Sequence, residues 1–107
     1  MSRLLLAATL ATAATAFAAE MPEFSIAIEN HRFTPDRIEV PAGRKVKLTV
    51  ANKDATPEEF ESHPLRVEKV IPGKSKATIF VGPLKPGEYR FVGEFNEKTA
   101  QGVIVAK

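Results

Sequence analysis

The 107-residue chain contains no cysteine and no tryptophan, and it has only one tyrosine and two histidines. Without cysteine it can form no disulfide, zinc finger, thiolate-ligated iron centre or blue copper centre, and it has no thiol nucleophile. An excess of one charge is also missing, because 15 Lys and Arg face 13 Asp and Glu for a formal net charge of +2. This balance provides no basic surface, so we expect no binding to nucleic acid or anionic lipid.

Long apolar runs are confined to the N-terminus. Arg3 precedes an uncharged apolar run over residues 4–17, and Ala16-Phe17-Ala18 supplies a small-x-small cleavage pattern. An uncleaved N-terminal anchor is the alternative, but the run is short for a permanent membrane-spanning helix. We therefore expect a cleaved signal peptide over 1–18, one domain over 19–107, a periplasmic location and no membrane insertion after cleavage.

Short segments of alternating polarity, separated by Pro, Gly and Asn, occupy the rest of the chain. In the clearest one, Val46, Leu48 and Val50 alternate with polar residues, as in a half-buried strand. Similar patterns predict seven strands, over 24–28, 37–40, 46–50, 65–70, 77–81, 89–92 and 102–105. No segment has a helical period. The pattern predicts an all-β fold, an antiparallel Greek-key sandwich of two sheets with seven to eight strands.

Two aromatic residues are assigned structural roles. Phe60 lies within a polar stretch from Ala55 to Pro64 that we expect to be a loop, and it is expected to plug the core beneath that loop. Tyr89 follows Pro86-Gly87 and resembles a tyrosine corner, in which the hydroxyl bonds upstream backbone. For Phe60 the alternative is an exposed contact.

Two patterns in the same order resemble the cupredoxin family and cover nearly all of the chain after the leader. The first is Phe33-Thr34-Pro35-x-x-Ile38-x-Val40-x-x-Gly43-x-x-Val46-x-Leu48-x-Val50-x-Asn52. The second is Pro86-Gly87-x-Tyr89-x-Phe91, followed by a loop and Gly102-x-Ile104-Val105. The most similar subgroup is the cupredoxin-like domain of EfeO-type and related ferrous-iron transport systems, of which the segments 58–62 and 68–71 are typical.

The resemblance also shows a departure from the blue-copper members of the family. Those members carry a His in the loop after the strand that ends here at Asn52, and Cys, His and Met after the Tyr-x-Phe strand. Pro57-Glu58-Glu59 occupies the first place, Gly93 stands at the Cys position, and Asn96 and Ala100 fall about where His and Met would sit. The resemblance therefore implies a cupredoxin without type 1 copper, because the soft sulfur ligand is missing.

Acidic and imidazole side chains are expected to gather at one end of the sandwich. If the strands ending at Val50 and Val92 run parallel, as in the family, the loops that follow them meet, beside the loop over 29–32. That end then collects eight groups: His31, Asp54, Glu58, Glu59, Glu61, His63, Glu94 and Glu97. In an extended segment, Glu59, Glu61 and His63 point to one side.

Carboxylates with imidazole suit iron, manganese or copper(II) rather than copper(I). The candidate metal ligands are His31, Glu59, Glu61, His63, Glu94 and Glu97. The other interpretation is that these carboxylates are solvated surface groups and that His31 is a turn residue bonded to neighbouring backbone.

Three functions fit these observations. The resemblance implies a periplasmic metal-handling protein that binds, oxidises or transfers iron, or binds copper(II), for the membrane components of a ferrous-iron uptake system; ferroxidase-like activity is one form of that role. The second is a metal-free adaptor that docks a partner protein through its acidic loops. The third is an envelope protein with neither property. The sequence shows no phosphate-binding glycine loop, nucleotide fingerprint or recognisable Ser/His/acid spacing.

Overall fold

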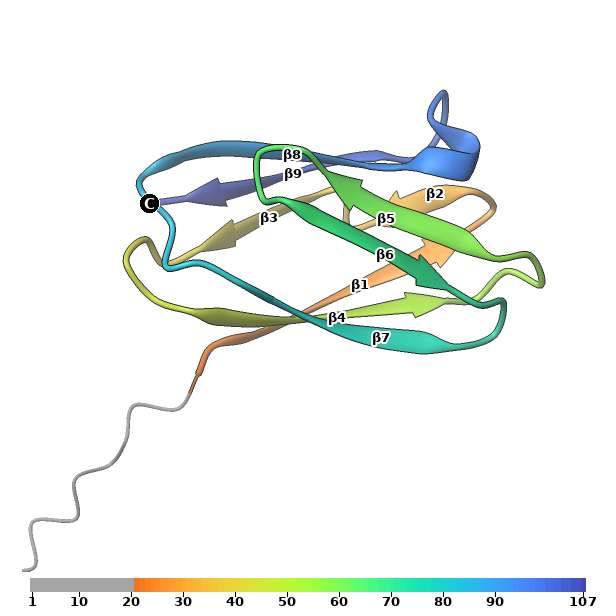
Figure 1. Cartoon of the computed structure of the whole chain (residues 1–107), viewed down its shortest axis with the longest axis horizontal. Coiled ribbons are helices and arrows are strands. Elements are labelled where there is room, and N and C mark those ends of the chain that lie inside the picture. The colour runs from red at the N-terminus through yellow and green to blue at the C-terminus, as the bar shows by residue number, and fades with distance from the viewer. Residues whose placement is uncertain (1–20) are drawn as a thin grey trace, which may run out of the picture.

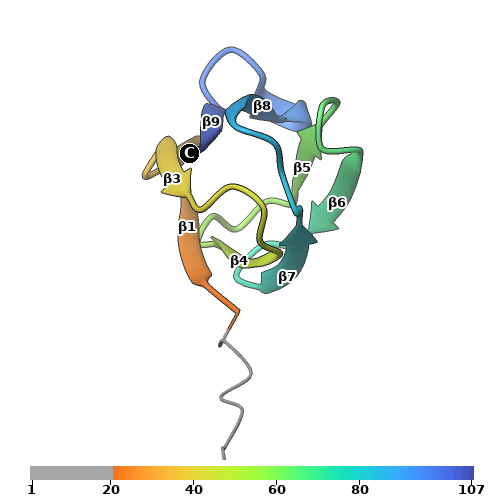
Figure 2. The same cartoon turned by 90° about the vertical axis from the view of Figure 1, so that its left-hand side faces the viewer.

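The computed structural model describes residues 21–107, which form nine strands in two sheets packed face to face (Figure 1). The expected signal peptide over 1–18 lies outside the described residues. The first sheet has the strand order β2 (Arg32–Thr34), β1 (Glu23–Glu29), β4 (Val46–Asn52) and β7 (Lys76–Val81). The second has the order β3 (Arg37–Val40), β9 (Gln101–Ala106), β8 (Gly87–Gly93), β5 (Glu58–Ser62) and β6 (Val67–Ile71). Figure 2 shows β4 and β7 on one side of the core and β8 and β9 on the other.

The all-β class and the two-sheet arrangement are confirmed, but the expectation of purely antiparallel sheets was wrong. β1 pairs with β4 in parallel, and β3 pairs with β9 in parallel, whereas the remaining pairs are antiparallel. The reason is a crossover: β3 lies between β1 and β4 in the chain but belongs to the opposite sheet. Because the chain crosses to the other sheet and back between β1 and β4, β4 can run in the same direction as β1 and pair with it in parallel.

All seven predicted strands are present, and residues 21–107 contain two more, β2 and β5. β5 occupies the stretch expected to be a loop. Its inward positions are Glu58, Phe60 and Ser62, all buried, while Glu59 and Glu61 face outward. Because two of the three inward residues are polar, the alternation of buried and exposed positions is hidden in the sequence.

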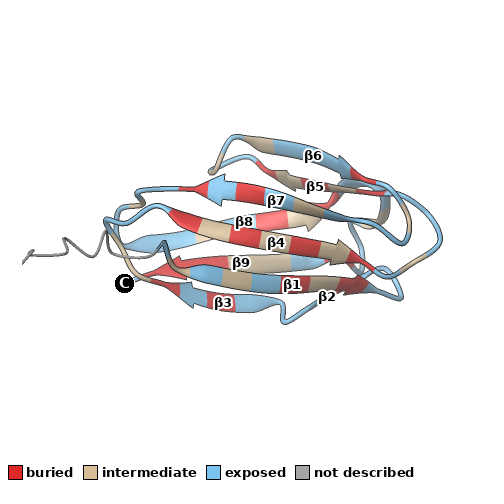
Figure 3. Cartoon of the chain, turned by 90° about the horizontal axis from the view of Figure 1, so that it is seen from below, coloured by how far each residue is buried: buried red, intermediate tan, exposed pale blue. Residues whose placement is uncertain are grey.

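The core lies between the sheets and is built from alternate residues of each strand, as the red and tan bands along β4 show in Figure 3. Phe60 is 0% exposed, which confirms its role as a core plug. Its ring stacks on Phe91, with centroids 4.8 Å apart, and Phe33 meets Phe91 edge to face at 4.9 Å. Such pairs add about 0.5–1.5 kcal/mol each beyond their area burial.

Tyr89 forms the predicted tyrosine corner. Its hydroxyl donates a hydrogen bond of 2.7 Å to the Lys85 carbonyl oxygen, upstream in the chain. The helical content of residues 21–107 is a single 3-10 turn, η1 (Glu94–Asn96), and no helix there is long and apolar enough to cross a membrane.

The three loops expected to meet do meet, and we refer to residues 29–32, 53–57 and 94–100 as the loop end of the sandwich (Figure 1). Asp54 accepts hydrogen bonds from the backbone N–H of Asn30 (2.9 Å) and of His31 (3.0 Å). The Thr99 hydroxyl donates to the His31 carbonyl oxygen at 2.6 Å. Three segments distant in the chain are thus tied together at this end.

Candidate functional site

Glu58 directly follows the 53–57 segment of the loop end. It opens β5 and points into the protein, with 2% of its surface exposed. Its Oε1 accepts hydrogen bonds from the Glu59 N–H and the Phe95 N–H, each 2.9 Å long. Its Oε2 accepts one of 2.7 Å from Asn96 Nδ2. Burying a carboxylate is costly unless its oxygens are hydrogen-bonded, and here both are. Glu58 thus lies at this end of the sandwich, as expected, but on a strand and not in the loop predicted over 55–64.

Gly93 and Ala100 pack against this carboxylate. A Cβ atom added to Gly93 would lie 2.7 Å from Glu58 Cδ and 2.7 Å from Ala100 Cβ, closer than such atoms approach in proteins. The Gly93 N–H donates to the Ala100 carbonyl oxygen at 2.9 Å, which closes the turn between β8 and β9. The four residues that the resemblance places at the blue-copper ligand positions therefore do lie together: Glu58, Gly93, Asn96 and Ala100.

These four residues do not fit a type 1 copper ion. A carboxylate, an amide and a methyl group replace the sulfur and imidazole ligands, and Gly93 has no side chain at all. The carboxylate also fills the space between Gly93 and Ala100. These residues therefore do not supply the sulfur and imidazole ligand set of a type 1 copper ion.

A second group of carboxylates lies on the outer side of β5, and we call it the acidic face: Glu59, Glu61, Glu68 and Glu94. Glu59 and Glu61 share one side of the strand, as the period of two predicts. Glu61 is paired directly with Glu68 of β6, and the Glu94 carboxyl lies within hydrogen-bonding reach of Glu59. Like charges placed directly opposite one another destabilise a sheet.

This crowding changes the acidity of two side chains. The hydrogen bond with Glu94, together with partial desolvation and repulsion from Glu94, Glu68 and Glu61, raises the pKa of Glu59 to about 7. Desolvation and then repulsion from Glu94 also raise the pKa of Glu61. Each charge responsible for these shifts belongs to another carboxyl group.

His31 lies across the η1 turn from the acidic face. Its backbone has a positive φ of 56°, and its side chain is 47% exposed, with Nδ1 3.6 Å from Asp54 Oδ2. Backbone hydrogen bonding from His31 is the main reason that the pKa of Asp54 is lowered. Glu94 and Glu97 line the same open depression as His31. His31 thus lies in a turn, but its N–H and carbonyl groups bond the Asp54 and Thr99 side chains rather than neighbouring backbone, and two of the candidate ligands lie beside it.

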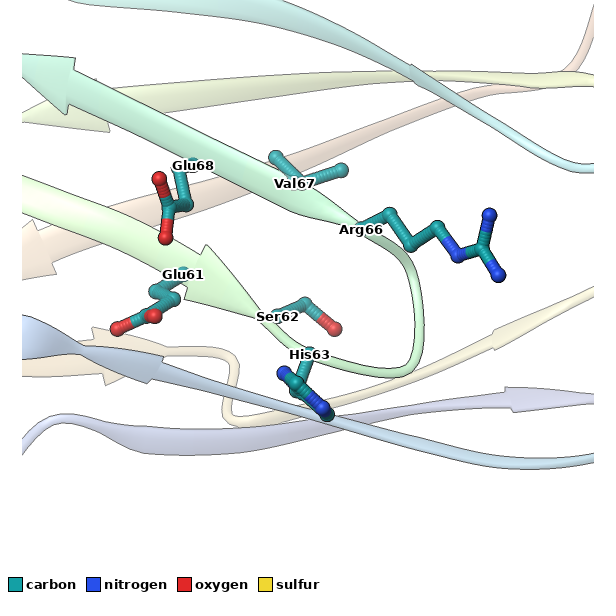
Figure 4. A pocket seen from close by; sticks show the side chains of 6 residues that line it. All are labelled: Glu61, Ser62, His63, Arg66, Val67 and Glu68. Atoms are coloured by element: carbon teal, nitrogen blue, oxygen red, sulfur yellow. The ribbon is translucent and has the colours of Figure 1, made fainter.

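His63 lies in the turn after β5 and not on the strand itself. It lines an open depression with Glu61, Glu68 and Arg66, and a second one with Glu61 and Glu97. Figure 4 shows Glu61 and Glu68 side by side on neighbouring strands, with the Arg66 guanidinium directed away from them. His63 therefore adjoins the acidic face at its Glu61 end.

Within residues 21–107, no group of three or more His, Asp or Glu side chains is placed so that it could hold a metal ion. Glu59, Glu61 and Glu94 are brought together, while the two histidines line different depressions, His31 beside Glu94 and His63 beside Glu61. The six-residue ligand set remains a prediction. Sequence reasoning missed Glu68 as a member of the face; the signal available was its outward position in the strand that follows β5.

Comparisons with known proteins agree with this fold. A family model described as a cupredoxin-like domain matches residues 2–106. The uncharacterized protein RP394 of Rickettsia prowazekii (strain Madrid E) is 45% identical over 83 residues, which are 78% of this chain and 66% of that protein. The chain thus spans slightly less than two thirds of that relative's length.

Solved structures share the fold at low sequence identity. The metal binding domain of the Cu(I)-exporting P-type ATPase CopA of Streptococcus pneumoniae D39 has a TM-score of 0.68 at 17% identity, covering 79% of this chain and 84% of that one. A purple cupredoxin from Nitrosopumilus maritimus has a TM-score of 0.61 at 17% identity, covering 78% and 98%. Amicyanin from Paracoccus versutus has a TM-score of 0.63 at 10% identity, covering 83% of each chain.

Proposed function

Because the chain belongs to the cupredoxin-like domain family, we propose that it is a periplasmic metal-handling protein that binds iron or copper(II) on its acidic face, as an accessory of a membrane ferrous-iron uptake system. The observation that carries the proposal is the gathering of Glu59, Glu61 and Glu94 on one face of the sandwich, with Glu68 directly opposite Glu61. The solved metal binding domain of CopA, which shares this fold, carries Cu(I) and supports a metal-related role.

The chemistry of the acidic face favours a hard cation. Carboxylate oxygens suit iron, manganese and copper(II), and a cation would remove the mutual repulsion of these side chains. Because the described residues hold no preformed group of three ligands, binding involves rotation of at least one carboxylate. Binding is also coupled to proton release, because a carboxylate must be deprotonated to act as a ligand.

The test is calorimetric titration of the purified protein with Fe²⁺ under anaerobic conditions, and then with Cu²⁺ and Mn²⁺. We expect saturable binding that is micromolar or tighter and that is lost in the double variant Glu59→Gln/Glu61→Gln. A matched control, Glu23→Gln/Glu88→Gln, removes the same number of carboxyl groups at the opposite end of the sandwich and should bind as the wild type does. Equal affinity in both double variants, or no binding of any ion, would overturn the proposal.

If binding is found, Fe²⁺ oxidation by the loaded protein is followed in air. Carboxylates bind Fe³⁺ better than Fe²⁺, and this preference makes loss of an electron easier. The electron must then pass to oxygen, to copper or to a partner protein. Turnover in air supports a ferroxidase-like role, whereas stable Fe²⁺ supports a carrier.

A second function, the metal-free adaptor, is favoured by Phe95. Its side chain is 52% exposed at the tip of η1, although its backbone N–H is fixed to Glu58 Oε1. Glu94 and Glu97 line the same depression, so the ring stands among acids, as in a surface for a basic partner. Capture of a basic partner that is lost with Phe95→Ser and weakened by salt, with no effect of metal ions, would establish this function instead.

A further inference from the structure

The carboxylate of Glu58 lies between β5 and the turn over 93–100, and its surroundings contain hydrogen-bond donors rather than metal ligands. We propose that Glu58 takes the structural place of a metal ion: it joins β5 to the turn over 93–100 through hydrogen bonds, and this position excludes cations. The inference concerns a position inside the protein, and it holds whether or not the acidic face outside binds an ion.

The hydrogen bonds around Glu58 all run toward its carboxylate oxygens. Three N–H groups, those of Glu59, Phe95 and the Asn96 side chain, point at the Glu58 carboxylate. Their positive ends converge on one place, which suits an anion and repels a cation. The position as built therefore favours the Glu58 carboxylate over a metal ion.

The hydrogen bonds continue from Glu58 into the turn over 93–100. Asn96, held by Glu58, accepts hydrogen bonds at its carbonyl oxygen from the N–H groups of Thr99 (3.1 Å) and Ala100 (2.8 Å). The Ala100 carbonyl oxygen then accepts from the Gly93 N–H. A single buried carboxylate thus organises the whole return from β8 to β9, as a metal bound by several residues of one loop would do.

Little space is left between Gly93 and the Glu58 side chain. A Cβ atom at Gly93 would lie 2.8 Å from Glu58 Oε2 as well as 2.7 Å from Glu58 Cδ. A side chain at position 93 and the Glu58 carboxylate therefore exclude each other. Glu58 can reach this position only because residue 93 is a glycine, which has no side chain.

The consequence for the surface is that Glu58 acts as a positioning residue. By holding the Phe95 N–H and the Asn96 side chain, it fixes η1 against β5. Glu94 and Phe95 of that turn are the residues that contribute to the acidic face and to the exposed apolar tip. The positions of Glu94 and Phe95 at the surface thus depend on the buried Glu58 side chain.

The first experiment is amide hydrogen exchange in Glu58→Gln, with Glu59→Gln as the matched control one residue away. A glutamine has the same size but no charge, so its one carbonyl oxygen accepts weaker hydrogen bonds from the two backbone N–H groups, while its NH₂ group faces the Asn96 donor. We expect exchange at the Phe95 and Glu59 amides to become at least about tenfold faster, while the remote Lys47 amide, which bonds the Pro22 carbonyl, is unchanged. Unchanged exchange at Phe95 in Glu58→Gln would overturn the proposal.

The second experiment tests whether Glu58 fills a metal position. The quadruple variant Glu58→His/Gly93→Cys/Asn96→His/Ala100→Met supplies the ligands of a thiolate–copper(II) centre, which absorbs visible light strongly. The triple variant that keeps Glu58 is the control, and its fold is checked by far-ultraviolet circular dichroism. We expect the absorption with Cu²⁺ in the quadruple variant only; the same absorption in the triple variant would contradict the inference.

Discussion

The two sides of β5 present carboxylates in opposite surroundings. On the inner side, Glu58 is buried, and N–H donors satisfy both of its oxygens. On the outer side, Glu59 and Glu61 are only partly buried, and the groups that shift their pKa values are other carboxyl groups. Neighbouring residues of one type thus serve different purposes: the satisfied carboxylate is a structural part, and the crowded ones are available to a cation.

The largest expected effect comes from removing one carboxylate from each side of β5 and comparing the stability of the two variants. Glu58→Ala leaves three partly buried N–H donors without an acceptor, at roughly 1 kcal/mol or more each, so we expect the free energy of unfolding to fall by about 3–5 kcal/mol. Glu59→Ala removes a repelled charge, so its stability at pH 7 should equal or exceed that of the wild type. Urea denaturation of both variants measures the difference. Equal losses would mean that the two sides of β5 do not differ in this way.

A substitution at Gly93 tests how closely the inner carboxylate, Glu58, is packed. Gly93→Ala brings a Cβ atom to within 2.7 Å of both Glu58 Cδ and Ala100 Cβ, so overpacking should cost about 1–3 kcal/mol of stability. In Glu58→Ala one of these clashes is gone, and the same substitution should then cost less. Urea denaturation of the two single variants and the double variant completes the cycle. Strictly additive losses would show that Gly93 is not required by the Glu58 carboxylate.

The comparison also explains what sequence patterns predict well here. Strands such as 46–52 alternate apolar and polar residues, so local periodicity predicts them, and the same period places Glu59 and Glu61 on one side. The meeting of the three loops followed from strand direction in the family that the chain resembles. These properties depend on residues close in sequence or on a topology that the resemblance already implies.

The inner side of β5 could not be predicted in this way. Glu58 is satisfied by residues 37 and 38 positions away in the chain, and the Ser62 hydroxyl donates to the Arg90 carbonyl, 28 positions away. Nothing local marks such polar residues as buried. Likewise, the pairing of Glu61 with Glu68 depends on the length and shape of the intervening turn, in which Arg66 has a positive φ of 54°.

The smallest effect expected is a dependence of stability on pH that comes from the outer side of β5. In the folded protein Glu59 keeps its proton up to about pH 7, whereas its ordinary pKa is 4.5. Between these values the folded state binds more protons than the unfolded state, so the free energy of unfolding should fall as pH rises from about 4.5 to 7. The lowered pKa values of Glu39 and Asp54 act at more acidic pH and do not mask this slope. Urea denaturation at several pH values should give a flatter profile for Glu59→Gln than for the wild type and for Glu88→Gln, and an unchanged slope in Glu59→Gln would show that the outer carboxylates do not share protons in the folded state.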